Sequence, residues 1–111
     1  MPQDLTFSIT TSDSNEEWGV VSNGSVDYTV ALGVSVVLAS ASVGQVSINL
    51  PDAAGDNVNR MITVKKTDAT ANNVVINPDG ADTIDGASSV SITTQYAAVM
   101  LISDGSNWSV L

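Results

Sequence analysis

The sequence predicts an all-β fold, either an antiparallel β-sandwich or a small barrel of the jelly-roll kind. Apolar and polar residues alternate over short stretches, as in Val46, Ile48 and Leu50, and this alternation is typical of a strand with one buried face. Turn-forming residues interrupt these stretches roughly every 8 to 12 residues. No helical period persists along the chain. Together these observations favour several short strands arranged as a sandwich or a small barrel.

The strand patterns follow one another along most of the chain. Pro51 ends one of them because proline cannot donate to a ladder. The run from Tyr96 to Ile102 is apolar on both parities, which predicts a strand covered on both faces. Residues 34–42 are the one rival segment, where Ala and Leu favour a helical turn and Ser, Val and Gly oppose it. The predicted strands span residues 5–9, 26–32, 46–50, 61–64, 74–76, 90–92, 96–102 and 108–111.

Polar turn signals separate these strands. Residues 66–73 (KTDATANN) have the composition and length of a hairpin turn between the strands at 61–64 and 74–76. NPDGAD and IDGAS each contain an Asp-Gly pair, a strong turn signal. We therefore expect one β-sandwich domain at 26–111, preceded at 1–25 by an N-terminal strand or arm and a polar loop.

Charge and composition exclude several classes of function. The 111 residues include twelve acidic and three basic ones and no histidine, so the net charge is −9. Such a surface repels phosphate backbones and anionic membranes, and we expect neither nucleic acid nor a membrane as a partner. Without Cys or His, the chain lacks thiol nucleophiles and the usual zinc ligands. The N-terminus has no secretory pattern, so we expect synthesis in the cytoplasm.

Acidic residues are the main candidates for a metal site or for catalysis, since a Ser or Thr nucleophile would have only Lys65 or Lys66 as its base. Asp79, Asp82 and Asp85 recur every third residue and, with Asn77, offer oxygen ligands to Ca²⁺. Asp-Gly turns account for the same pattern, and no Glu completes a calcium loop, so we expect no metal. Paired carboxylates can hydrolyse glycosides, but these stand in turn-like contexts where solvent keeps them ionised. We therefore expect no catalytic residue, no cofactor and no enzyme.

The three basic residues, Arg60, Lys65 and Lys66, lie close together in the sequence. Lys65 and Lys66 are adjacent, so on a strand they point to opposite faces. One is then solvated, and the other extends its ammonium group to water or pairs with a carboxylate. The three residues are candidates for ion pairs between subunits, and the alternative is a solvated group or a pair within the chain.

Four residues near the N-terminus are candidate contacts with a partner. Leu5, Phe7 and Ile9 form an alternating strand that either adds to the sheet edge of a neighbour or begins the core of this domain. Trp18 stands in a polar segment, where it caps its own domain, anchors the segment on another protein, or offers a platform to a carbohydrate. Of the other aromatic residues, Tyr96 and Trp108 are expected to fill the core.

The order of elements in residues 62–111 carries a family resemblance. A strand ends in the Lys-Lys of ITVKK, and a Thr-Asp/Ala-Asn loop and a Val-Ile strand follow. Pro-Asp-Gly and Thr-Ile-Asp-Gly turns come next, then a polar-apolar strand, a Tyr-led strand and Ser-Asp-Gly-Ser-Asn-Trp. In this order the parts resemble a β-module of tailed-bacteriophage virion proteins, found in tail fibres and in capsid decoration and head proteins. DYTV and VSINLP extend the resemblance upstream more weakly.

The resemblance implies a compact β-domain, usually trimeric, that serves structure or adhesion rather than catalysis. The chain begins and ends almost where the module does, without a long shaft. This favours a capsid decoration (cement) or head-knob protein over a tail fibre. We therefore expect a homotrimer on the capsid surface of the virion, made in the host cytoplasm, with the major capsid protein as its partner. The alternative is a tail- or head-fibre tip that recognises host surface glycans.

Overall fold

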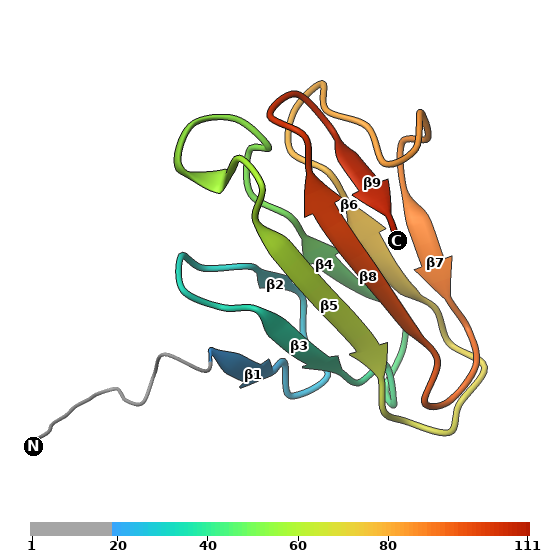
Figure 1. Ribbon diagram of the computed structural model, residues 1–111. Coiled ribbons are helices and arrows are strands. Elements are labelled where there is room, and N and C mark those ends of the chain that lie inside the picture. The colour runs from blue at the N-terminus through green and yellow to red at the C-terminus, as the bar shows by residue number, and fades with distance from the viewer. Residues whose placement is uncertain (1–18) are drawn as a thin grey trace, which may run out of the picture.

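The computed structural model describes residues 19–111, which form two packed β-sheets (Figure 1). The candidate contacts Leu5, Phe7, Ile9 and Trp18 lie outside the described residues. The first sheet has the strand order β1-β3-β5-β8-β9, and the second has the order β2-β4-β6-β7. The elements are β1 (Val20–Ser22), β2 (Tyr28–Thr29), β3 (Val36–Ala39), β4 (Val46–Asn49), the 3₁₀ helix η1 (Gly55–Asn57), β5 (Met61–Lys66), β6 (Val74–Asn77), β7 (Val90–Ile92), β8 (Ala98–Ser103) and β9 (Trp108–Val110).

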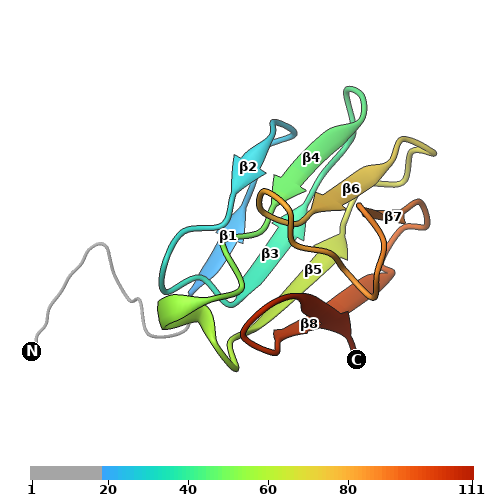
Figure 2. The ribbon, with the colours of Figure 1, turned by 90° about the horizontal axis from the view of Figure 1, so that it is seen from above.

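From β1 to β6 the chain crosses from one sheet to the other after every strand. Consecutive odd-numbered strands therefore pair in parallel in the first sheet, and consecutive even-numbered strands do so in the second. Figure 2 shows the two layers from above, with β3 and β5 in one layer and β4 and β6 in the other. This part of the chain therefore winds like a short, two-sheet β-helix, with one strand in each sheet per winding, and we call it the coil.

The last three strands end the coil, because each of them runs antiparallel to the strand beside it. β7 pairs antiparallel with β6, β8 pairs antiparallel with β5, and β9 pairs antiparallel with β8. The outer edge of β9 is covered by the loop between β6 and β7, because the Trp108 N–H donates to Thr83 O and the Asp85 N–H donates to Trp108 O. A covered edge has few free groups for pairing with another strand.

The core lies between the sheets and consists of the inward side chains of both. Alternate positions of each strand face inward, as the strand geometry requires. Val64, Ile48 and Ile76 are fully buried, and Trp108 is 1% exposed. The Trp108 Nε1–H donates to Pro51 O over 3.2 Å, which satisfies the one polar group of its ring. Full burial of a Val or Ile side chain stabilises a fold by about 1.5–3 kcal/mol relative to leaving it exposed.

The predicted all-β class is confirmed, but the antiparallel arrangement is wrong for most of the pairs. Four of the seven strand pairs among the described residues are parallel. The expected hairpin across residues 66–73 is also wrong, because β5 and β6 belong to different sheets. Turn-forming residues determine that the chain changes direction, and they leave open whether the next strand joins the same layer or the opposite one.

Several segments differ from their expected roles. Residues 34–42 contain the strand β3 and no helix, and residues 20–22 of the expected polar loop form β1 of the first sheet. The run from Tyr96 to Ile102 forms β8 from Ala98 onward, and the single chain covers only one of its two faces, since Met100 is 42% exposed. β-branched and long apolar side chains on both parities favour a strand whether or not its second face is covered.

Candidate interaction surface

The second sheet carries mostly polar side chains on the side away from the core. Thr29, Asn49 and Asn77 are register partners on β2, β4 and β6. The Asn77 amide donates to Asn49 Oδ1 over 3.3 Å, and the Asn49 amide donates to Thr29 Oγ1 over 3.4 Å. Ser47 and Ser91 flank this ladder on the same side. This side of the molecule is suited to water.

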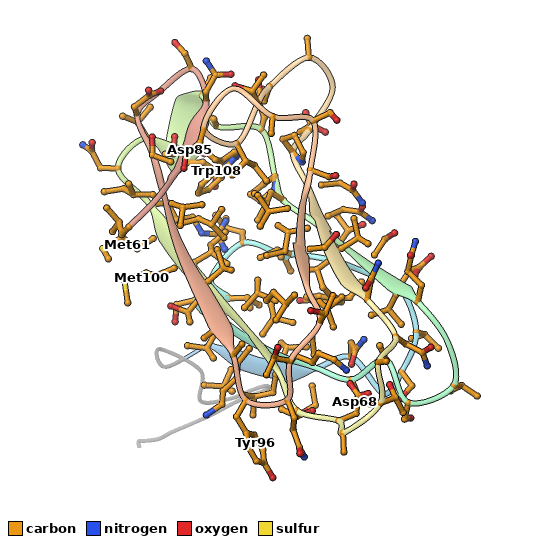
Figure 3. The ribbon with its side chains drawn as sticks, turned by 90° about the vertical axis from the view of Figure 1, so that its right-hand side faces the viewer. Met61, Asp68, Asp85, Tyr96, Met100 and Trp108 are labelled. Atoms are coloured by element: carbon orange, nitrogen blue, oxygen red, sulfur yellow. The ribbon has the colours of Figure 1, made fainter. Side chains whose placement is uncertain are left out.

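The first sheet is different, because its outward side chains are mostly apolar. Val20, Met61 and Met100 are 55%, 45% and 42% exposed. Figure 1 views the molecule onto this sheet, with β5 and β8 in front, and in Figure 3 Met61 and Met100 point away from the body on one side. We call this surface the outer face. It consists of Val20, Ser22, Val36, Leu38, Met61, Thr63, Lys65, Ala98, Met100, Ile102 and Ser109.

Tyr96 and Lys65 lie at one end of the outer face. The Lys65 ammonium stands 5.5 Å from the centre of the Tyr96 ring, within the range of a cation–π contact. The Tyr96 side chain is 65% exposed, so the expectation that it fills the core is wrong. Its backbone has φ +68°, a left-handed conformation that turns the chain just before β8 begins. Figure 3 shows the ring pointing away from the body at the lower end.

Lys66 is fully buried and pairs within its own chain, which is one of the alternatives that the sequence left open. Its ammonium lies 2.7 Å from Asp68 Oδ2, and the Asp68 side chain is 7% exposed. Burial opposes the charged carboxylate, but the bonds from Lys66, from the Thr70 hydroxyl and from the Ala41 and Thr70 N–H groups outweigh it. Together they hold the pKa of Asp68 well below its ordinary value.

The Lys66–Asp68 pair belongs to a stack of turns at the same end of the coil. The Ala41 N–H donates to Asp68 Oδ1 over 2.7 Å, and the Asn72 amide donates to Ala41 O over 2.8 Å. One turn earlier, the buried Asn23 accepts from the Ser40 N–H over 2.8 Å and donates to Ser40 O over 3.1 Å. Side chains therefore join each turn to the next, in place of the backbone ladder that joins the strands.

Arg60 stands apart from the two lysines. Its guanidinium donates to the carbonyl oxygen of Ala31 and to Asn57 Oδ1, each over 2.8 Å, and also to Val34 O. These contacts tie the segment before β5 to the loop before β3. The structure thus places Arg60, Lys65 and Lys66 in three different surroundings. Of the three, only Lys65 lies on the outer face, and ion pairs across a subunit boundary stay a prediction.

The predicted acidic triplet is rearranged. Asp79 and Asp82 lie together with Asp52, and the nearest carboxylate oxygens of the three are all within 4.8 Å of one another. Asp85 instead accepts from the Val110 N–H over 3.2 Å and helps to cover β9. Asp52 was missed although the sequence contains a signal for it. INLPD (48–52) and INPD (76–79) share the Ile-Asn register of β4 and β6, so the aspartates that follow lie close together.

Comparisons with known proteins add no family to these observations. No protein-family model matches the chain, and no curated protein matches it. Among the described residues, no helix is long and apolar enough to cross a membrane. The strongest functional feature of the described residues is therefore the contrast between the apolar outer face of the first sheet and the polar side of the second.

Proposed function

We propose that this chain is a structural protein of a tailed-bacteriophage virion, a capsid decoration (cement) or head-knob protein that binds the capsid surface as a homotrimer. The observation that carries this proposal is the apolar outer face on a chain of net charge −9. An exposed apolar surface of this kind marks a site of contact with protein. The proposal needs no catalytic group and no cofactor.

The resemblance of residues 62–111 to the phage virion module supports the particle assignment. This segment supplies most of β5 and all of β6, β7, β8 and β9, which are the central and closing strands of both sheets. The matched turns, including Asp104–Asn107, have a structural role here. The Asp104 carboxylate accepts from the N–H groups of Ser106 and Asn107 over 2.9 and 2.8 Å. A rigid module held by such turns suits a protein that stabilises a shell.

The proposed mechanism relies on area and avidity. A trimer at a three-fold or quasi-three-fold position meets three equivalent capsid patches with three copies of one contact. Once the first copy is bound, the others bind at a high effective concentration, so a modest contact gives a tight complex. A decoration protein of this kind ties neighbouring capsomers together and raises the resistance of the shell to heat and internal pressure.

Two measurements test the proposal. Light scattering of the purified chain at micromolar concentration should give about three times the chain mass of 11.4 kDa. The same protein should cosediment with capsids that lack their own copy, at a saturating ratio of three chains for each site, and should raise the temperature at which they break open. Isolated tails serve as the control. Binding to tails and not to capsids would contradict the decoration role.

A glycan-binding fibre tip is the second candidate, and the exposed Tyr96 favours it. An aromatic ring that is 65% exposed, beside Lys65, offers an apolar face to a sugar ring. On a glycan array, this candidate expects binding that a Tyr96→Ala variant loses, with no change in its melting temperature. A decoration protein would show no such binding and would still cosediment with capsids.

A further inference from the structure

We propose that the outer face of the first sheet is the surface at which copies of this chain pack against one another. This inference rests on the proposed function, because it assigns the homotrimer a contact surface. Met61 and Met100 lie on the two paired strands β5 and β8 in the middle of that face. The occupant of the face is a second copy of this chain, and the polar side of the second sheet stays in water.

The first argument is the difference between the two outward surfaces of one small domain. On the second sheet, Asn49 and Asn77 form a side-chain ladder, and the one apolar outward residue of β4 and β6 is Val75. On the first sheet, the register partners Met61 and Ile102 are both apolar. If water covered both sides of the domain, polar outward side chains would be expected on both sheets. Long thioether side chains are also adaptable in packing, which suits a contact surface.

The second argument is the distribution of charge. Each copy carries a net charge of −9, so two copies repel each other unless they meet where carboxylates are absent. None of the outward residues of the first sheet is acidic, and Lys65 is the one charged residue among them. The Asp52–Asp79–Asp82 cluster and the Asp68 turn lie elsewhere. An uncharged, apolar surface is the place where identical acidic chains associate with least repulsion.

The third argument is the conformation of Tyr96 at the end of this face. A bulky residue at φ +68° is uncommon, and it persists only where the surrounding structure holds it. Here the Tyr96 N–H donates to Lys66 O over 2.7 Å, and the Lys66 N–H donates to Ala97 O over 3.0 Å. The fold therefore maintains a strained turn that leaves an aromatic ring exposed beside the outer face. Exposed tyrosines are common anchors of protein interfaces.

The test uses the full chain with lysine placed on either side of the sandwich. Met100→Lys puts a charge in the middle of the outer face, and Val75→Lys puts the same charge in the middle of the opposite surface. We expect light scattering to give a threefold lower mass for Met100→Lys and an unchanged mass for Val75→Lys. Circular dichroism and thermal melting of each variant report whether the monomer remains folded.

A second measurement keeps the inference testable even if the lysine variant fails to fold. The chain contains no cysteine, so Met100→Cys and Val75→Cys each carry a single thiol. In one isolated chain, position 100 is exposed and position 75 is half-buried, so the thiol at 100 would react faster with a water-soluble reagent. In the proposed assembly, this order is reversed, and the thiol at position 100 reacts about tenfold more slowly than the thiol at position 75.

The outcomes distinguish a failure of this inference from a failure of the proposed trimer. If the wild-type chain is a trimer but Met100→Lys keeps its mass, and the thiol at position 100 reacts faster than the thiol at position 75, the outer face is not the contact and the trimer stands. If the wild-type chain is a monomer at every concentration, the trimer is wrong, and this inference fails with it. A smaller mass for Met100→Lys but not for Val75→Lys, together with a slowly reacting thiol at position 100, supports both the trimer and the outer face as its contact surface.

Discussion

Replacing Asp68 by asparagine tests how the turns of the coil are held together. The amide side chain of the Asp68→Asn variant would keep an oxygen for the Ala41 N–H, which now lies 2.7 Å from Asp68 Oδ1, but would lose the ion pair with Lys66. Lys66 is fully buried, and within residues 19–111 Asp68 is the one carboxylate that pairs with it, so this part of the chain would leave its ammonium buried without a charged partner. Breaking a buried pair from one side costs about 3–5 kcal/mol. We expect the lower end, about 3 kcal/mol, because the Asp68 side chain is 7% exposed and the pair is not fully enclosed.

The assay is thermal and urea unfolding of Asp68→Asn at neutral pH. A loss of about 3 kcal/mol lowers the melting temperature of a domain of this size by roughly 12–24 °C. Asp104→Asn is the matched control, because Asp104 also accepts two backbone N–H bonds in a turn but is exposed and unpaired with any cation in the described residues. The double variant Lys66→Met/Asp68→Asn removes both charges, and we expect it to recover part of the loss.

The dependence on pH follows from the lowered pKa of Asp68. A carboxyl group whose pKa is lower in the folded chain stabilises the fold fully above its unfolded pKa, which is about 3.9. That stabilisation is lost as the pH falls through the folded pKa. The stability difference between wild type and Asp68→Asn should therefore be constant between about pH 5 and 7 and shrink below about pH 4. An Asp68→Asn variant with the same melting temperature as Asp104→Asn at neutral pH would refute this reasoning.

Three further predictions concern the acidic cluster and the N-terminal segment. A chelator should leave the melting temperature unchanged, whereas removal of an ion bound at a hundred times its dissociation constant would lower the free energy of unfolding by about 2.7 kcal/mol. Asp79→Asn should raise the melting temperature, because it relieves the repulsion of Asp79 with Asp52 and Asp82. A lower melting temperature for Asp79→Asn would contradict this. Deleting residues 1–18 should leave a folded trimer, because residues 19–111 supply both sheets, but should abolish cosedimentation with capsids. An unfolded product would place Leu5–Ile9 in the core, and unchanged cosedimentation would place the capsid contact elsewhere.

Single strands could be predicted from the sequence because their signal is local. Alternation fixes the inward positions of β4, and Pro51 follows its end closely. The partner of each strand is not a local property. The polar residues 66–73 specify a turn in the same way whether β6 pairs beside β5 or crosses to the other sheet. The recurrence of Ile-Asn in INLPD and INPD was the available signal for parallel stacking, since these shared pairs align in register on the adjacent strands β4 and β6.

The candidate site was predictable to a similar extent. The sequence predicts that Lys65 and Lys66 face opposite sides, and parity with Ile62 and Val64 identifies Lys66 as the inward one. Its pairing with Asp68 depends on the turn between the sheets, which the sequence assigned to a hairpin. The exposure of Tyr96 depends on a left-handed backbone conformation that its residue type disfavours. Such a conformation has no sequence signal in the neighbouring residues.

The two sheets also differ in the sequences of their strands, and this difference bears on the outer face. In the second sheet, β4 (VSIN) and β7 (VSI) alternate strictly between apolar and polar residues. In the first sheet, β3 (VVLA) and most of β8 (AVMLIS) are apolar on both parities. Such a run is typical of a strand with both faces covered, yet the single chain leaves the side of Met100 open. A second copy on the outer face would cover it, and the strands of the first sheet would then have the surroundings that their sequence predicts.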